Sequence, residues 1–288
     1  MASLRDIRRR IRSVKNTRQI TKAMKVVAAS KLRRAQEQII AARPMAHKLM
    51  EVMASLAARV DRDRHPLLAK REVRKVEVVV ITGDRGLCGA FNTNILREAD
   101  RLLKRETEAG HEPRLNLIGR KGRDYYRRRP YPRDQEVVGV FGGNIDFKVA
   151  QQVGKELIEQ YANAEYDLLY LVYNEFKNAL QQRVVVEQLL PIEPAPVPEG
   201  TVAVDYIYEP SADEILADLL PRYMETELFR ALLESQAAEL GARMTAMDAA
   251  TNNASELIST LTLQFNRARQ AAITKELMEI IGGAEALK

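Results

Sequence analysis

Two heptad-repeat segments, one near each end of the chain, constrain the fold more than any other feature. In the first, small and apolar residues alternate in steps of four and three: Ala28, Leu32, Ala35, Ile39, Ala42, Ala46, Leu49, Met53, Leu56 and Val60. In the second, the same alternation runs through Leu233, Ala237, Leu240, Met244, Met247, Thr251, Ala254, Ile258, Leu261, Phe265, Ala268 and Ala272. A repeat of about 3.5 residues is that of a left-handed coiled coil. The sequence therefore predicts two long helices that pair with each other.

The residues around these segments lengthen both helices. Between residues 3 and 59 the only helix breaker is Pro44, and between residues 211 and 281 only Pro221 and Gly241 interrupt helical character. Ser211 and Glu214 have the spacing of a capping box, which marks a helix start. At a rise of about 1.5 Å per residue the two helices would measure roughly 85 Å and 105 Å. Helices of this length are predicted to project from any small domain as a rod.

The heptad phase also predicts the register of the two helices. If both leave the central part of the chain at one level, facing residues have numbers that sum to roughly 272. Leu32 then faces Leu240, and the polar Thr21 faces the polar Thr251. Residues beyond Arg269 extend past the start of the first helix, and this apolar end is expected to need a sleeve around it.

The central region has the composition of an α/β domain. Strands are predicted at residues 76–82, 114–119, 136–141, 166–173, 182–190 and 202–208, and helices at residues 92–108 and 146–163. Strands that alternate with helices favour a partly parallel sheet. The predicted division is an N-terminal coiled-coil helix over residues 1–60, a central α/β domain over 61–210 and a C-terminal coiled-coil helix over 211–288.

The residues provide little evidence of catalysis. The turn at residues 83–89 follows a strand and is rich in glycine, but it matches neither G-x-G-x-x-G nor a Walker A loop, so a tight turn is favoured over a phosphate site. Cys88 is interpreted as a buried thiol rather than a nucleophile. The three histidines lack ligand spacing, and Glu276 and Glu279 form an ordinary helix pair. The sequence therefore predicts no catalytic, cofactor-binding or metal site.

Charge is concentrated at the start of the chain. The formal net charge is +6. Twelve lysines and arginines lie within the first 34 residues, with Asp6 as the only acid. This pattern fits either an acidic partner or a solvated helix face. With no apolar run of membrane-spanning length, no secretory signal and a single cysteine, the chain is expected in the cytosol.

Three segments carry a resemblance to a known family. They are ITKAMKVVAASK at residues 20–31, GDRGLCG at 83–89 and NRARQAAITKELMEIIGGA at 266–284. Together they resemble the gamma subunit of F-type (proton-translocating) ATP synthases. The resemblance implies an α/β fold with a long coiled coil, in which antiparallel N- and C-terminal helices form a rod with an inserted Rossmann-like α/β domain. It also implies a non-catalytic rotor shaft, without cofactors, on the cytoplasmic face of the bacterial cell membrane.

The resemblance further implies partners and contact residues. The shaft turns inside a ring of alpha and beta subunits, and the α/β domain rests with an epsilon subunit on the membrane-embedded c-subunit ring. The implied rotor–stator contacts are Met24, Lys25, Arg267, Arg269, Gln270 and Thr274. The implied contacts with the membrane ring are Tyr206, Tyr208 and Glu209.

Two other functions remain as alternatives. A nucleic-acid-binding coiled coil would explain the basic first helix but leaves the α/β domain unexplained, and its binding would weaken steeply with salt. A nucleotide-binding enzyme built on the central sheet is disfavoured because the sequence lacks a phosphate-binding motif.

Overall fold

The computed structural model describes residues 3–57, 65–192 and 211–285. The chain divides into two compact units. The first unit contains residues 1–28 and 244–288, and the second contains residues 29–243. Two long helices contribute to both units: α1 (Leu4–Ala57) and α5 (Ala212–Glu285). At the start of α5 the Glu214 N–H donates to Ser211 Oγ at 3.3 Å, which is one half of the predicted capping box, and the Ser211 hydroxyl donates to Glu214 Oε1 at 3.1 Å.

In the first unit α1 and α5 pair in antiparallel orientation, and three contacts along the pair define their register. The hydroxyl groups of Thr21 and Thr251 are hydrogen-bonded at 2.8 Å. Lys25 Nζ lies 2.6 Å from Asp248 Oδ1. Nearer the start of α1, the Arg8 guanidinium stacks over the Phe265 ring at 5.3 Å. These contacts confirm the register predicted from the heptads.

In the second unit the same two helices continue to pack through their heptad positions. Leu32 and Ala35 of α1 form a buried cluster with Ala237 and Leu240 of α5. This confirms the predicted meeting of Leu32 with Leu240.

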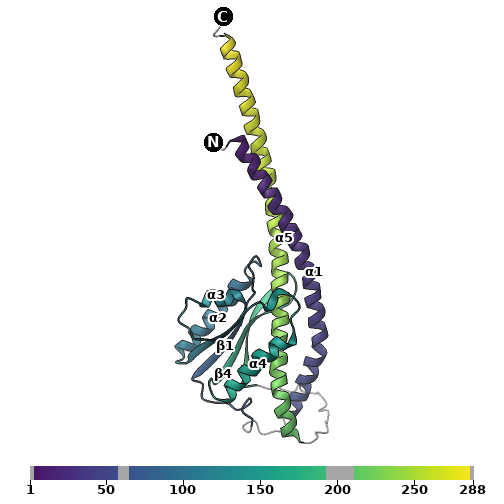
Figure 1. The fold of residues 1–288 in the computed structure, drawn as a ribbon, viewed down its shortest axis with the longest axis vertical. Helices are drawn as coiled ribbons and strands as arrows, with labels where there is room; N and C mark the ends of the chain where they lie inside the picture. The colour runs from purple at the N-terminus through teal and green to yellow at the C-terminus, as the bar shows by residue number, and fades with distance from the viewer. Residues whose placement is uncertain (1–2, 58–64, 193–210, 286–288) are drawn as a thin grey trace. The chain divides into compact units, whose positions relative to one another are not determined.

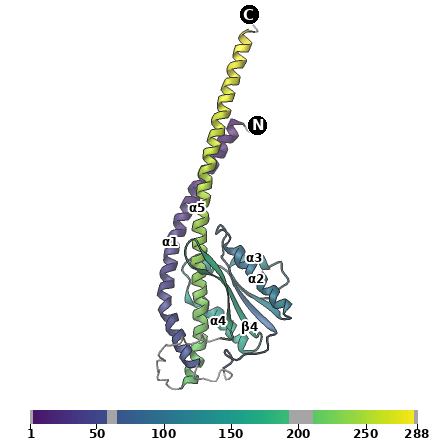
Figure 2. The same ribbon diagram turned by 180° about the vertical axis from the view of Figure 1, so that it is seen from behind.

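The second unit contains a five-stranded sheet between two layers of helix (Figures 1 and 2). Its strands are β1 (Lys75–Ile81), β2 (Glu112–Ile118), β3 (Arg133–Val137), β4 (Leu168–Phe176) and β5 (Gln182–Leu190). Their order is β3-β2-β1-β4-β5, with β5 antiparallel to β4 and the other pairs parallel. The fold therefore combines a mixed α/β sheet with two long helices, as predicted.

Each face of the sheet has its own apolar core. Helices α2 (Phe91–Glu108) and α3 (Arg120–Tyr126) lie on one face, where Ile95 and Leu103 are fully buried. Helix α4 (Phe147–Ala162) and α5 lie on the other, where Leu157 and Leu228 are buried. The alternating side chains of β1 supply both cores, because successive residues of a strand point to opposite faces.

Within the second unit α5 is enclosed on every side. Nine of the ten residues from 231 to 240 are buried, which no single seam of a helix explains. Two polar contacts accompany the apolar ones: Ser235 Oγ accepts a hydrogen bond from the Asn174 N–H at 3.2 Å, and Gln236 Nε2 donates to Gly143 O at 2.6 Å. The helix therefore passes through this unit as part of its core.

Two sequence predictions differ from the structure. The strand predicted at residues 136–141 is wrong beyond Val137, because Gly139 has a φ of 84° in the left-handed region and a short 3-10 turn follows at Val140–Gly142. Helix α3 was not predicted, since it is only seven residues long and contains Gly122. The strand predicted at residues 202–208 lies outside the described residues.

Candidate functional site

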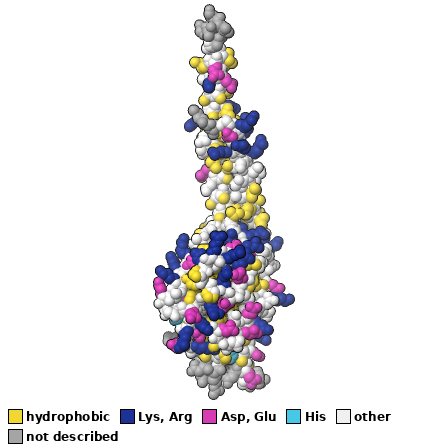
Figure 3. Space-filling model, turned by 60° about the vertical axis from the view of Figure 1, so that its left-hand side comes forward, with side chains coloured by type: hydrophobic (Ala, Val, Ile, Leu, Met, Phe, Trp, Pro, Cys, Tyr) yellow, Lys and Arg dark blue, Asp and Glu magenta, His cyan; other side chains and the backbone are white. Residues whose placement is uncertain are grey.

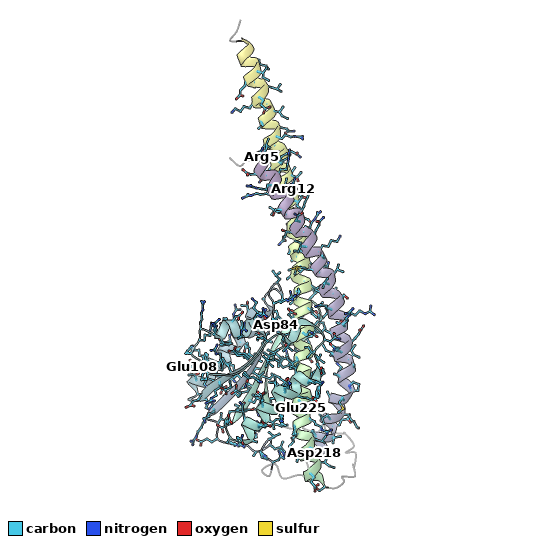
Figure 4. All side chains as sticks on the ribbon, viewed as in Figure 1. Arg5, Arg12, Asp84, Glu108, Asp218 and Glu225 are labelled. Carbon is cyan, nitrogen blue, oxygen red and sulfur yellow. The ribbon has the colours of Figure 1, made fainter. Side chains whose placement is uncertain are left out.

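The carboxyl end of the parallel sheet is where open α/β folds bind anionic ligands. Here that position holds a carboxylate of the protein itself. Asp84 Oδ1 accepts hydrogen bonds from the backbone N–H groups of Arg120 at 3.0 Å and Gly139 at 2.9 Å, and Oδ2 accepts one from Phe141 at 3.1 Å. Figure 4 labels Asp84 at this edge of the sheet. Asp84 thus joins the loops that follow β1, β2 and β3.

The glycine-rich turn around Asp84 is built for close backbone approach. Gly119 has a φ of 99°, and a Cβ atom placed there would lie 2.0 Å from the Thr82 carbonyl oxygen. Cys88 is 1% exposed in the same turn, and burial raises the pKa of its thiol. The turn is therefore a structural junction, and the prediction that Cys88 is a buried thiol is confirmed.

The first unit presents a cluster of positive charge near the start of α1, which we call the basic collar. Its members are the exposed side chains of Arg5, Arg8, Arg9, Arg10, Arg12, Arg267 and Arg269. Lysine and arginine side chains gather midway along this unit in Figure 3, and Arg5 and Arg12 are labelled on α1 in Figure 4. Asp6 is paired with Arg9 at 2.9 Å. Such an excess of positive charge fits an acidic partner surface.

The predicted contact residues Arg267, Arg269, Gln270 and Thr274 are all exposed on α5. At about 100° per residue, Arg267, Gln270 and Thr274 fall on one stripe of the helix, whereas Arg269 points to a different side. Among the described residues, none forms an ion pair or hydrogen bond with the Arg267 or Arg269 side chain. The two guanidinium groups therefore face away from each other and are available to partners.

Met24 and Lys25 lie at a different level of the same unit. Both are half-buried, and Lys25 is paired with Asp248. Because Asp248 precedes Arg267 by 19 residues on one continuous helix, the two sets are separated by roughly 28 Å along the axis. The predicted contacts thus form two separate surfaces. The register and opposite charges of Lys25 and Asp248 were a signal for their pairing that the sequence reasoning missed.

The end of α5 extends beyond the start of α1 within the first unit (Figure 1). Its apolar side chains are open to solvent: Ile273 is 49% exposed and Ile280 is 69% exposed, and Leu277, Met278 and Ile281 are similar. From Arg269 to Glu285 this single helix spans roughly 25 Å. The predicted overhang is confirmed. A long exposed apolar surface marks a place where another molecule binds.

The described residues contain neither a metal-binding cluster nor a membrane-spanning helix. The predicted ring contacts Tyr206, Tyr208 and Glu209 lie outside the described part of the chain. In the described part, no group of three or more histidine, cysteine, aspartate or glutamate side chains is placed to hold a metal ion. No helix there combines the length and the apolar character that crossing a membrane requires.

Comparisons with known proteins agree over the whole chain. A family model described as ATP synthase matches residues 3–287. The chain is 54% identical to the ATP synthase gamma chain of Desulfitobacterium hafniense and 53% identical to that of Anaeromyxobacter sp., and both alignments cover all of each chain.

Solved structures show the same fold. A chain in the Tetrahymena thermophila mitochondrial ATP synthase central stalk and c-ring is 28% identical with a TM-score of 0.61, over 80% of this chain and 99% of that one. A chain in the Euglena gracilis mitochondrial enzyme is 20% identical with a TM-score of 0.69, over 99% and 94%, which is a likeness of fold alone. Full-length matches to curated gamma chains above 50% identity lead to one conclusion: this chain belongs to the ATP synthase gamma chain family.

Proposed function

We infer that this chain is the central rotor shaft of an F-type ATP synthase and that it couples proton flow to ATP synthesis or hydrolysis without catalysing either reaction. The observation that carries this inference is the end of α5, which is helical, apolar, exposed and unpaired in the first unit. An isolated helix of this length is marginal in water. The end of α5 therefore turns within a surrounding sleeve that a ring of alpha and beta subunits provides.

The mechanism is conformational coupling through an asymmetric surface. Arg267, Gln270 and Thr274 occupy one stripe of α5, Arg269 another, and α1 covers a third side. A subunit that surrounds this helix meets a different set of charges at each rotational angle. A ligand or contact shifts a conformational equilibrium only through its differential interaction with the two states. Rotation therefore changes the nucleotide affinity of each catalytic site in turn.

The remaining partners follow from the same assignment. Met24 and Lys25 make a second contact with the head, farther from the C-terminal end of α5 than the basic collar is. Residues 1–60 and 211–288 form the shaft, and residues 61–210 form the domain that meets the epsilon subunit and the membrane ring, with Tyr206, Tyr208 and Glu209 as the ring contacts. The complex lies on the cytoplasmic face of a bacterial cell membrane.

The geometry of the sheet disfavours a nucleotide-binding enzyme. The backbone N–H groups at the carboxyl end of the strands already donate to the carboxylate of Asp84. A nucleotide phosphate brought to the same place would meet electrostatic repulsion.

The test is single-molecule rotation and ATP-driven proton pumping in the reconstituted complex. Replacing Arg267, Arg269 and Gln270 together by alanine is expected to lower torque and pumping while assembly is kept, because exposed side chains contribute little to folding. A matched control replaces two arginines and one glutamine of α1 outside the basic collar, Arg34, Gln36 and Arg43, which are also exposed, and it should leave torque and pumping unchanged. Unchanged torque and pumping in the first variant would remove these three residues from the mechanism.

The end of α5 is tested separately by deletion. Removing residues 279–288 one turn at a time is expected to weaken assembly and torque in graded steps, because a bearing depends on covered area rather than on single bonds. An abrupt loss at one residue would indicate a specific contact instead of a bearing.

A further inference from the structure

Glu77 is a buried carboxyl group that neither core explains. It lies on β1, is 0% exposed and points to the sheet face covered by α4, the same face as Val79 and Ile81. Asn116 Nδ2 donates a hydrogen bond to Glu77 Oε1 at 2.7 Å. In the described residues the other oxygen, Oε2, has no donor. A buried polar atom without a partner costs free energy, and a buried unpaired charge costs more.

An irregularity in the neighbouring strands brings a second carboxyl group to Glu77. In the parallel pairing of β2 with β3, Leu115 faces Arg133 and Asn116 faces Gln135, so Asp134 is the extra residue of a bulge. Bulges redirect a side chain. Asp134 comes within hydrogen-bonding reach of Glu77, and Arg114 Nη1 donates to Asp134 Oδ2 at 3.3 Å.

The two carboxyl groups satisfy each other only when they share a proton. If both are ionised, each offers acceptors alone, and Glu77 Oε2 stays without a donor. A proton on Glu77 turns Oε2 into a donor to Asp134, which also accepts a hydrogen bond from Arg114 Nη1. Burial, and then the charge of Asp134, raise the pKa of Glu77 to about 8, against the opposing effects of Arg114 and Asn116.

We propose that Glu77 and Asp134 form a buried proton-binding site, and that the bound proton fastens the edge strand β3 to the centre of the sheet. This inference does not depend on the rotor assignment. Among the described residues strand β3 is paired on one side only, so no other described strand compensates for a weakened contact at its bulge. Loss of the proton places two carboxylates side by side and loosens β3.

The groups that surround this site set its charge. On β2 it meets Arg114 and Asn116, and β4 offers the apolar Leu169 opposite Glu77. From the turn before β4 comes Tyr166, whose hydroxyl donates to Leu157 O at 2.6 Å and whose pKa is raised by burial and then by Glu77. Tyr161 of α4 packs on Tyr166. Glu156 of α4 accepts a hydrogen bond from Gln135 Nε2 through Oε2 at 2.7 Å.

The strand that the proton holds also forms the wall of a groove. A cavity of about 640 Å³ lies between α4 on one side and β3 and its following loop on the other. Its lining includes Gln135, Val137, Val149 and Glu156. Loosening of β3 therefore changes the shape of this groove with pH.

Hydrogen exchange of the full-length chain tests the effect on β3. With a pKa of about 8 the ionised fraction of Glu77 rises from roughly 0.1 at pH 7 to roughly 0.9 at pH 9. After correction for intrinsic base catalysis, exchange of residues 133–137 relative to β1 should rise about ninefold over this range. Glu77→Gln keeps a donor for Asp134 at every pH and should abolish the rise. The matched control Glu136→Gln, on the same strand, should retain it.

Infrared spectroscopy tests the proton directly. The wild-type chain should show the C=O band of a neutral carboxylic acid at pH 7 that is lost by pH 9, and Glu77→Gln should lack this band. Asp134→Asn removes the neighbouring negative charge and should move the titration to lower pH. A pH-dependent exchange that persists in Glu77→Gln, or a wild-type spectrum without the band at pH 7, would overturn the proposal.

Discussion

Arg230 holds α5 to the β4–β5 hairpin within the second unit, and its removal should be costly. Its guanidinium donates to Glu187 Oε2 at 2.9 Å, to Glu227 Oε2 at 2.8 Å and to the Tyr173 hydroxyl at 3.0 Å. Glu227 is only 4% exposed, and its pKa is raised by burial in spite of Arg230. Arg230→Met leaves Glu227 buried without a cation. Breaking a buried ion pair in this way costs about 3–5 kcal/mol.

The lower end of this range is expected, because the side chains of Arg230 and Glu187 are 30% and 36% exposed to solvent, and solvent weakens the interaction between their charges. We therefore expect Arg230→Met to lower the free energy of unfolding by about 3 kcal/mol in urea titrations of the full chain. Arg101→Met is the matched control, since the Arg101 side chain is 69% exposed and its only ion pair in the described part of the chain is with Glu98 on α2; it should change the free energy of unfolding by less than about 0.5 kcal/mol.

A second substitution separates charge from packing. Glu227→Gln combined with Arg230→Met removes the uncompensated carboxylate and should recover more than half of the lost stability. If Arg230→Met cost less than about 1 kcal/mol, or if the double variant recovered nothing, the argument from a buried, unpaired charge would be refuted.

Two further predictions concern titration and register. Because the pKa of Glu77 rises from 4.5 to about 8 on folding, the folded state retains a proton between these pH values that the unfolded state has lost. The free energy of unfolding, measured by chemical denaturation, should therefore fall by about 1.4 kcal/mol per pH unit between pH 4.5 and 8, about 5 kcal/mol in total, and then level off. The same fall in Glu77→Gln would contradict the assignment. In a Cys88→Ala background, Thr21→Cys with Thr251→Cys should cross-link under mild oxidation, because the two hydroxyls lie 2.8 Å apart. Thr21→Cys with Ile258→Cys, shifted by one heptad, should not, and the reverse result in non-reducing gels would reject the register.

The coiled coil could be predicted from sequence because one repeat encodes both the buried face and the register. Steps of four and three place Leu32 opposite Leu240, and the same register places the polar Thr21 opposite the polar Thr251. The exposed end of α5 followed from the same arithmetic. Its function could be inferred only through the family resemblance, since exposed apolar residues indicate that something binds but not which molecule binds.

The features of the sheet could not be predicted, because they depend on contacts between distant segments. Asp84 joins three loops that are separated by up to 57 residues in sequence. Asp134 reaches Glu77 only through a bulge, and the polar sequence of β3 gives no signal of one. Helix α3 escaped prediction because seven residues are too few to show a period.

The enclosure of α5 in the second unit has a mechanical consequence. A helix that is buried on every side, with Ser235 and Gln236 bonded to the surrounding backbone, cannot slip inside its housing without unfolding it. A torsional load applied to the sheet therefore reaches α5 undiminished. Elastic twist during a working stroke must then be stored before the contacts at Arg267, in the first unit from residue 244 onward, where α1 is the only described element that covers α5.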